Sequence, residues 1–192
     1  MNFPAIYLAS RSPRRRELLS QMAVDFAVLA ADVDESVQPG ESPQDYVQRI
    51  AVEKARAGVS GLAANDKKPV LAADTAVIVD QTIFGKPVND DDARRMLKML
   101  SGQSHQVMTA VALASENDLK TALSVSEVRF AAMTEAEIDW YIQTGEGRDK
   151  AGSYAVQGLG AIFIDQIQGS YSGIMGLPVR ETGQLLMQMS EG

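Results

Sequence analysis

The sequence contains no cysteine and only one histidine, His105, among its 192 residues. The absence of cysteine excludes disulfides, thiolate nucleophiles, and cysteine-ligated zinc or iron–sulfur centres. A single histidine excludes zinc sites and mechanisms that need two imidazoles. Side-chain chemistry must therefore come from carboxylates, amines, guanidinium groups and hydroxyls.

The chain also lacks an excess of positive charge and any long apolar run. Its net charge is −7 and its pI about 4.7, so duplex nucleic acid is not an expected partner. No run approaches the ~18 apolar residues of a membrane span, and the short apolar run near the N-terminus has no basic region before it, unlike a secretory signal. We expect a cytoplasmic protein without a membrane partner.

Apolar and charged residues make up 45% and 22% of the chain, as in ordinary folded proteins. The length suits one domain, residues 1–192. Helical and strand periodicities alternate without a long linker, which predicts an α/β fold with a mixed sheet. Strands are predicted over residues 4–10, 25–31, 69–79, 104–115, 119–132 and 160–164. Helices are predicted to begin at Pro13, Pro43 and Pro178 and to follow N-caps at Asp90 and Thr134.

The junction between the first strand and the first helix is rich in hydroxyl and guanidinium groups. It reads Ser10-Arg11-Ser12-Pro13-Arg14-Arg15-Arg16, with no acid before Glu17. A helix N-terminus offers free backbone N–H groups and partial positive charge, so this junction can hold a polyphosphate. It is not a Walker loop, because no GxxxxGK[ST] sequence occurs. The alternative is that Ser12 only caps the helix while the arginines are solvated.

Asp74 interrupts the apolar strand over residues 69–79. A buried carboxylate needs a pairing partner, a hydrogen bond or a metal. In a regular strand Thr75 points to the opposite face, so both residues can serve one ligand only if the backbone bends or the ligand sits at the strand end. The alternative for Asp74 is an internal hydrogen-bond acceptor.

Three further features are weak when taken alone. Lys54 follows Ile50 at helical spacing, which turns its amine inward toward an anionic partner. The Asp34-Glu35 pair is equally typical of a solvated turn, and Lys86 stands in Gly85-Lys86-Pro87. His105 has no catalytic constellation around it in the sequence, which indicates a structural role.

Together these residues carry a family resemblance. The sequence is similar to the Maf family of nucleoside triphosphate pyrophosphatases along essentially its whole length. Eight motifs occur in family order: SRSPRR at 10–15, DE at 34–35, EKA at 53–55, AADT at 72–75, GKP at 85–87, SGQ-x-H at 101–105, DKAGSYAVQG at 149–158 and GLP at 176–178.

The resemblance implies a mixed twisted sheet with flanking helices, in two lobes around a central cleft, as in inosine triphosphate pyrophosphatases. It also implies a homodimer. The implied reaction is hydrolysis of a nucleoside triphosphate between the α and β phosphates, giving a monophosphate and pyrophosphate with a divalent metal. Oxygen ligands from Glu35 and Asp74 suit Mg²⁺ or Mn²⁺.

Carried over one residue at a time, Asp74 matches the family's proposed general base, although the sequence does not separate that role from metal binding. The other matched active-site positions are Ser12, Arg15, Glu35, Lys54 and Lys86. Substrate choice in the family follows three positions, here Arg14, Thr75 and Gln157, a set that resembles the branch acting on dTTP and UTP. The match assigns no role to Glu53, Arg129 or Lys150.

Two alternatives to this activity stay open at the level of sequence. One is a nucleotide-binding regulator of cell division and septum formation with little turnover, against which the full set of charged residues argues. The other is a different phosphohydrolase, such as a monophosphatase or the 7-methyl-GTP type of pyrophosphatase. Modified pyrimidine triphosphates would fit the same site as dTTP and UTP.

Overall fold

A computed structural model describes residues 3–190, which fold around a seven-stranded mixed sheet. The strand order is β2-β1-β3-β5-β6-β7, with β4 paired to β3. Strand β1 lies parallel to β2 and β3, and the other pairs are antiparallel. The strands are β1 (Ile6–Ala9), β2 (Phe26–Leu29), β3 (Val70–Val79), β4 (Thr82–Phe84), β5 (Ser104–Ala114), β6 (Leu119–Phe130) and β7 (Ile164–Gln168).

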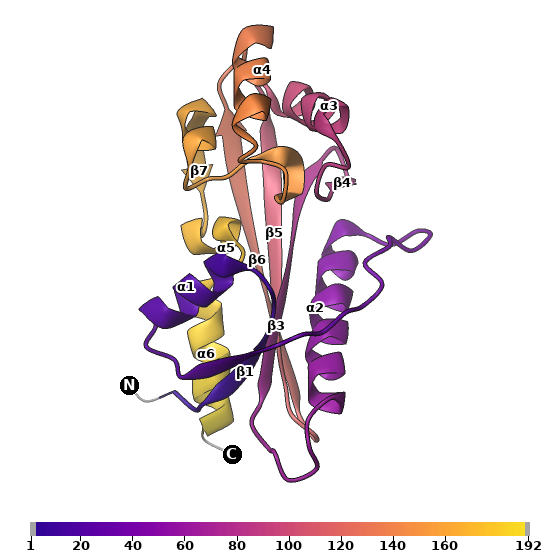
Figure 1. The fold of residues 1–192 in the computed structure, drawn as a ribbon, viewed down its shortest axis with the longest axis vertical. Helices are drawn as coiled ribbons and strands as arrows, with labels where there is room; N and C mark the ends of the chain where they lie inside the picture. The colour runs from indigo at the N-terminus through magenta and orange to yellow at the C-terminus, as the bar shows by residue number, and fades with distance from the viewer. Residues whose placement is uncertain (1–2, 191–192) are drawn as a thin grey trace.

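Helices cover both faces of the long strands β3, β5 and β6 (Figure 1). In that view α2 lies on one side, α1, α5 and α6 lie on the other, and α3 and α4 stand at the far end. The helices are α1 (Pro13–Gln21), α2 (Pro43–Ser60), α3 (Asp90–Leu100), α4 (Glu135–Thr144), α5 (Tyr171–Met175) and α6 (Val179–Ser190), with 3-10 turns η1 (Ala151–Ser153) and η2 (Leu159–Phe163).

Alternation along β3 builds two hydrophobic cores, one on each face of the sheet. Leu71 and Val77 belong to the core that contains residues of α1, α3, α4 and α6. Ala72 and Ile78 belong to the core beneath α2. Because a one-residue slip would exchange the two faces, burial on both sides fixes the register of β3.

Most predicted elements are confirmed, apart from the short strand β4, which was not predicted, and three further differences. The α3 N-cap is Asn89 rather than Asp90, since the Asn89 side chain accepts the Asp92 N–H. Residues 160–164 do not form a strand: the 3-10 turn η2 precedes β7, which starts at Ile164. The short helix α5 was not predicted. Both late differences fall in a glycine-punctuated region where backbone N–H groups bond to side chains of other elements, Gly160 to Glu146 and Ser170 to Ser126, and these bonds override local propensity.

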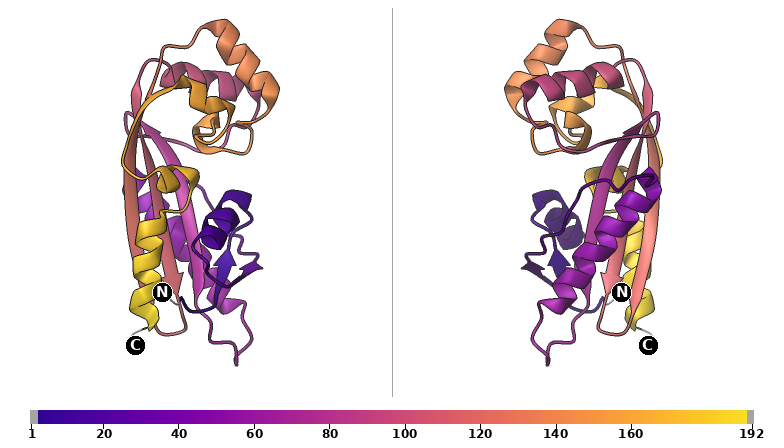
Figure 2. Two further views of the ribbon diagram at one scale, coloured as in Figure 1. Left: turned by 90° about the vertical axis from the view of Figure 1, so that its left-hand side faces the viewer. Right: turned by 90° about the vertical axis from the view of Figure 1, so that its right-hand side faces the viewer.

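The elements form two lobes joined by the long strands. Figure 2 shows α3, α4 and the 3-10 turns at one end, and α1, β1, β2 and α6 at the other. A cleft opens between the ends and is lined by residues of both, so the predicted two-lobed α/β fold is confirmed. Within residues 3–190, no helix combines the length and apolar character needed to cross a bilayer.

Candidate active site

The site begins at a gap in the pairing of β3. One edge of β3 pairs with β5 over nearly its whole length. On the other edge, β1 pairs only with Val70 and Leu71, and β4 pairs only from Val77 onward. Residues 72–76 therefore have an open edge. A ligand lying against it can reach both faces of the strand, so Asp74 and Thr75 meet one ligand without a bend in β3 and away from its end.

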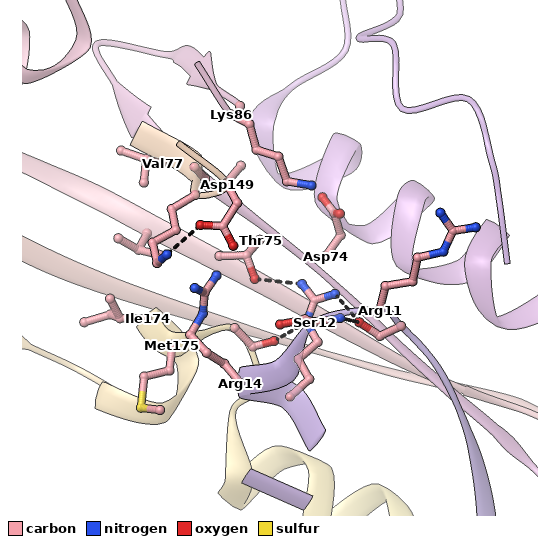
Figure 3. A pocket seen from close by; sticks show the side chains of 18 of the residues that line it. Arg11, Ser12, Arg14, Asp74, Thr75, Val77, Lys86, Asp149, Ile174 and Met175 are labelled. Atoms are coloured by element: carbon pink, nitrogen blue, oxygen red, sulfur yellow. Dashed lines mark hydrogen bonds and ion pairs between the residues drawn. The ribbon is translucent and has the colours of Figure 1, made fainter. Parts of the chain in front are cut away.

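The cleft at this edge has a volume of about 610 Å³, within the usual range for small-molecule sites. The nine residues predicted for the site all line it, although they come from six separate segments. In Figure 3, Lys86 and Asp74 point toward one another across the cleft. The nine are Ser12, Arg14, Arg15, Glu35, Lys54, Asp74, Thr75, Lys86 and Gln157.

The Lys54 ammonium lies between two carboxylates. Its Nζ is 2.9 Å from Oδ1 of Asp74 and 2.7 Å from Oε1 of Glu35. Lys54 lies on the apolar face of α2, with Ile50 and Ala51, so the helix packed on β3 delivers the amine directly to Asp74. The side chains of Lys54 and Asp74 are both nearly buried. The inward direction predicted for Lys54 is confirmed, and its anionic partners are identified.

The two carboxylates differ in their environment. Burial raises the pKa of Asp74, and the opposing charges of Lys54 and Arg15 do not fully cancel that effect. Glu35 is half exposed; burial acts to raise its pKa too, but Lys54, Lys86 and Arg15 hold that pKa below its usual value. Two neighbouring carboxyl groups with opposite pKa shifts are suited to different tasks, and Asp74 is the better proton acceptor.

The segment that carries Glu35 is tied to α2. The Tyr46 hydroxyl donates to the Glu35 carbonyl at 3.0 Å. Arg49 donates to the Ser36 carbonyl at 3.0 Å and forms an ion pair with Glu41. Burial and the charge of Asp74 raise the pKa of Tyr46 to about 12, so its hydroxyl keeps the proton that it donates.

The junction before α1 does not behave as a simple cap. Ser12 occupies the N-cap position, but its side chain makes no capping hydrogen bond. Its hydroxyl is therefore available to a ligand at the helix N-terminus, together with the partial positive charge there. The alternative of a bare cap with solvated arginines is therefore wrong for Ser12 and for Arg15, which is packed among other residues, whereas Arg11 and Arg16 are exposed as it expects.

The Arg15 guanidinium is fixed by contacts from three parts of the chain. It donates to the Gly176 carbonyl at 2.8 Å, to the Ser10 hydroxyl at 3.2 Å and to the Thr75 hydroxyl at 3.3 Å. Burial lowers its pKa, but an arginine stays charged in proteins. A guanidinium has five N–H donors, and these contacts occupy one on each nitrogen, which leaves a pair of N–H groups for an anion.

Other charged residues of the cleft were not predicted as site residues, although Arg11 and Lys150 were noted in the sequence. Asp149 and Lys150 line it and are paired with each other at 2.6 Å, and Arg11 lines it beside Asp32. Asp149 and Lys150 belong to the motif at 149–158, which was the available signal. Several charged residues that the sequence drew attention to do not line the cleft, namely Arg16, Asp34, Glu53 and Arg129.

His105 lies outside the cleft lining, in agreement with its expected structural role. It is buried between Phe130 and Tyr154, and its Nε2 is 2.8 Å from the Tyr154 hydroxyl. Burial lowers the pKa of His105 to about 4, so the ring is neutral at physiological pH.

The donor set fits a hard divalent cation that shares its ligands with a substrate. No group of three or more histidine, aspartate or glutamate side chains in residues 3–190 could hold a metal alone. Asp74 and Glu35 nevertheless contact one and the same cationic group, the Lys54 ammonium. Mg²⁺ is commonly bound through one or two carboxylates together with substrate phosphates, and this pair meets that description.

Comparisons with known proteins agree along the chain. The family model described as "Maf-like protein" matches residues 5–189. A dTTP/UTP pyrophosphatase of Pseudoalteromonas atlantica is 52% identical over 96% of this chain and 97% of its own. The dTTP/UTP pyrophosphatase of Chromobacterium violaceum is 49% identical over 97% of this chain and 96% of its own. The Staphylococcus aureus Ham1 protein superposes on 66% of this chain and 72% of its own, with 16% identity and a TM-score of 0.48.

Proposed function

The chain belongs to the Maf-like protein family, and we propose that it hydrolyses dTTP and UTP to the nucleoside monophosphate and pyrophosphate. Relatives that share about half of its residues over nearly the full chain carry the name dTTP/UTP pyrophosphatase. The observation that carries the proposal is the contact of one buried ammonium, Lys54, with the carboxylates of Asp74 and Glu35 at the open edge of β3.

The triphosphate lies among the cationic and hydroxyl groups of the cleft. Ser12 and the N-terminus of α1 face it from one lobe, and Lys86 faces it from the other. Arg15 offers a pair of N–H donors already held in place by Gly176, Ser10 and Thr75. Contacts to the β-phosphate strengthen as charge grows on the leaving pyrophosphate, so they accelerate the reaction rather than merely bind substrate.

Asp74 acts as the general base. A water molecule attacks the α-phosphorus, and the carboxylate of Asp74 takes its proton. The bond between the α-phosphorus and the bridging oxygen breaks, and pyrophosphate leaves with the bonding electrons. The raised pKa of Asp74 supports this role, because a stronger base accepts a proton more readily.

Glu35 and Asp74, which both contact the Lys54 ammonium, would hold a Mg²⁺ or Mn²⁺ ion together with substrate phosphates. When bound, the ion supplies charge that neutralises the polyphosphate. The net charge of the chain is −7, and the fixed cations of the cleft are partly paired with its own carboxylates.

Arg14, Thr75 and Gln157 select the base. Gln157 is exposed to the cleft and carries one donor and one acceptor on a single amide. The edge of uracil or thymine presents acceptor, donor, acceptor, and cytosine reverses two of these. A wrong base leaves polar groups unpaired, at about 1–3 kcal/mol each.

The experiment is a panel of dTTP, UTP, CTP, ATP, GTP and 7-methyl-GTP with Mg²⁺, with the released products identified. We expect monophosphate and pyrophosphate from dTTP and UTP, and no turnover when Mg²⁺ is removed with a chelator. Release of inorganic phosphate would indicate a phosphatase. Tight binding without turnover would favour the regulator, and a preference for 7-methyl-GTP would favour that branch.

The homodimer, the single domain over residues 1–192 and the cytoplasmic location stay predictions of the same proposal. Light scattering after size-exclusion chromatography measures the mass against 20.7 kDa for one chain. A single cooperative unfolding transition is expected for one domain. Fractionation of cells that produce the protein tests the location.

A further inference from the structure

Glu146, which follows α4, holds the segment that carries Gln157. Its Oε1 accepts the N–H of Leu159 at 2.8 Å, and its Oε2 accepts the N–H of Gly160 at 3.0 Å. Oε2 also accepts the Tyr141 hydroxyl at 2.7 Å. One carboxylate therefore receives both backbone N–H groups that follow Gly158.

Tyr141 ties down the other end of the same segment. Its hydroxyl oxygen accepts the N–H of Ala155 at 3.1 Å while its proton goes to Glu146. The bonded residues, Ala155 on one side and Leu159 with Gly160 on the other, bracket Gln157. The Gln157 side chain itself is exposed and lines the cleft, so the backbone is fixed while the amide faces the ligand.

Glu146 lies so close to residue 158 that only glycine fits at that position. A Cβ on Gly158 would lie 1.9 Å from Oε1 of Glu146, so no side chain is possible there without moving the carboxylate or the segment. Although burial acts to raise it, the pKa of Glu146 is lowered, because the N–H of Gly160, the Tyr141 hydroxyl and the N–H of Leu159 all donate to the carboxylate. The anionic form makes these hydrogen bonds charge-assisted and strong.

We propose that Glu146 is a positioning residue that determines base specificity: by anchoring residues 155–160 it holds Gln157 where the amide meets only one pattern of donors and acceptors. This inference rests on the proposed function. An amide on a mobile segment could adjust to several bases, whereas one on a fixed segment leaves a mismatched base unpaired.

Glu146 is separated from the reacting groups. Neither Glu146 nor Tyr141 lines the cleft, whereas Asp74, Lys54 and Glu35 lie together at the open edge of β3. Loss of the anchor should therefore change the ranking of bases far more than the chemical step. A role in stability alone would lower the activity toward every base together.

The test is Glu146→Gln, which keeps the shape of the side chain but turns one of its two acceptor oxygens into a donor. We expect the ratio of kcat/KM for UTP over CTP to fall by at least about tenfold, with kcat for UTP changed less than about threefold. Tyr141→Phe removes the links to Ala155 and Glu146 without a change of charge, so the ratio should move in the same direction. It keeps the test available if Glu146→Gln does not fold.

The matched control is Glu137→Gln. Glu137 belongs to the same helix α4, where its carboxylate completes the capping box with Thr134, and it lies outside the cleft lining. This variant removes the carboxylate charge from the first turn of α4, which weakens the helix slightly, and leaves residues 155–160 bonded, so the UTP to CTP ratio should stay at the parent value. A ratio that falls equally in Glu137→Gln would assign the effect to stability and overturn the proposal.

Hydrogen exchange supplies a readout that needs no turnover. The amides of Leu159 and Gly160 should exchange faster in Glu146→Gln than in the parent, and as slowly as the parent in Glu137→Gln. An unchanged base ratio or unchanged exchange in folded Glu146→Gln would overturn the proposal. Absence of dTTP and UTP hydrolysis in the parent itself would instead overturn the proposed function.

Discussion

The Lys54 ammonium donates to the Asp74 carboxylate across 2.9 Å, between helix α2 and strand β3. The same ammonium meets Glu35, so Lys54 serves as the cation for both proposed metal ligands when no metal is bound. On the proposed function, a metal ion that binds without nucleotide would have to displace the Lys54 ammonium from both carboxylates. When the metal binds together with the nucleotide, the Lys54 ammonium can instead form an ion pair with the substrate phosphates.

Replacing Lys54 with methionine should therefore tighten the binding of Mn²⁺ to the nucleotide-free protein. Removing the ammonium leaves two carboxylates close together without their common partner, and we expect at least about tenfold higher Mn²⁺ affinity by electron paramagnetic resonance titration. Turnover should fall, because the phosphates lose a cation. Glu53→Gln, on the same helix but outside the cleft lining, is the control. Equal or weaker Mn²⁺ binding in Lys54→Met would contradict the competition.

Asp74→Asn should abolish turnover and leave nucleotide binding largely intact. The amide keeps the shape of the carboxylate but neither accepts the proton of water nor holds the metal well. We expect kcat to fall by at least about 100-fold, and the Kd for UTP, measured by calorimetry, to change much less. Asp80→Asn, at the exposed turn after the same strand, should behave as the parent. Near-normal turnover in Asp74→Asn would remove Asp74 from the mechanism.

Lys86→Ala and Arg15→Ala should have similar effects on kcat/KM but different effects on the free energy of unfolding. Each replacement by alanine should lower kcat/KM by at least about tenfold through one lost phosphate contact. Lys86 is exposed, so Lys86→Ala should change the free energy of unfolding by less than about 0.5 kcal/mol. Arg15→Ala also leaves the Gly176 carbonyl without its donor, which should cost about 1–3 kcal/mol in urea denaturation. Unchanged kinetics in both variants would place the triphosphate elsewhere.

Gln157→Glu should weaken the preference for dTTP and UTP. The carboxylate replaces the only donor of the amide with an acceptor, so the match to the uracil edge is lost. The measurement is kcat/KM for dTTP, UTP, CTP, ATP and GTP in the parent and the variant. Equal rates across the bases in the parent, or an unaltered ranking in the variant, would show that Gln157 does not read the base.

The single histidine should make stability depend on pH. In the folded protein the pKa of His105 is about 4, against 6.5 for a free side chain. As pH falls below about 6.5, the unfolded chain binds a proton that the folded chain does not, so stability is lost between about pH 6.5 and pH 4. The parent should lose about 2 kcal/mol more than His105→Gln between pH 7 and pH 5 in urea denaturation. Parallel curves would contradict this.

Local patterns predicted the elements and many of the site residues well. Apolar spacing placed Lys54 on the buried face of α2, and strand alternation placed Asp74 and Thr75 on opposite faces of β3. How one ligand meets both faces depends on where β1 stops and β4 begins along the edge of β3. That is a non-local property of strand pairing, which no window of sequence contains.

The region after α4 was the hardest to predict for the same reason. Residues 160–164 have the composition of a strand, but Glu146 binds the N–H groups of Leu159 and Gly160 and curls the chain into η2. Ser170 begins α5 as a cap, and the Gly176 after it carries the carbonyl that receives Arg15. The Glu146 and Arg15 bonds connect different elements of the chain, so only the three-dimensional structure identifies them.

The hydrogen bond between Arg15 and Gly176 joins residues 161 positions apart. During synthesis Arg15 emerges from the ribosome 161 residues before Gly176. A growing chain that stops before Gly176 has its arginine-rich turn but lacks the carbonyl that orients Arg15 and the α5 wall of the cleft. We therefore expect hydrolysis of pyrimidine triphosphates to begin only after Gly176 has been synthesised and has folded against Arg15.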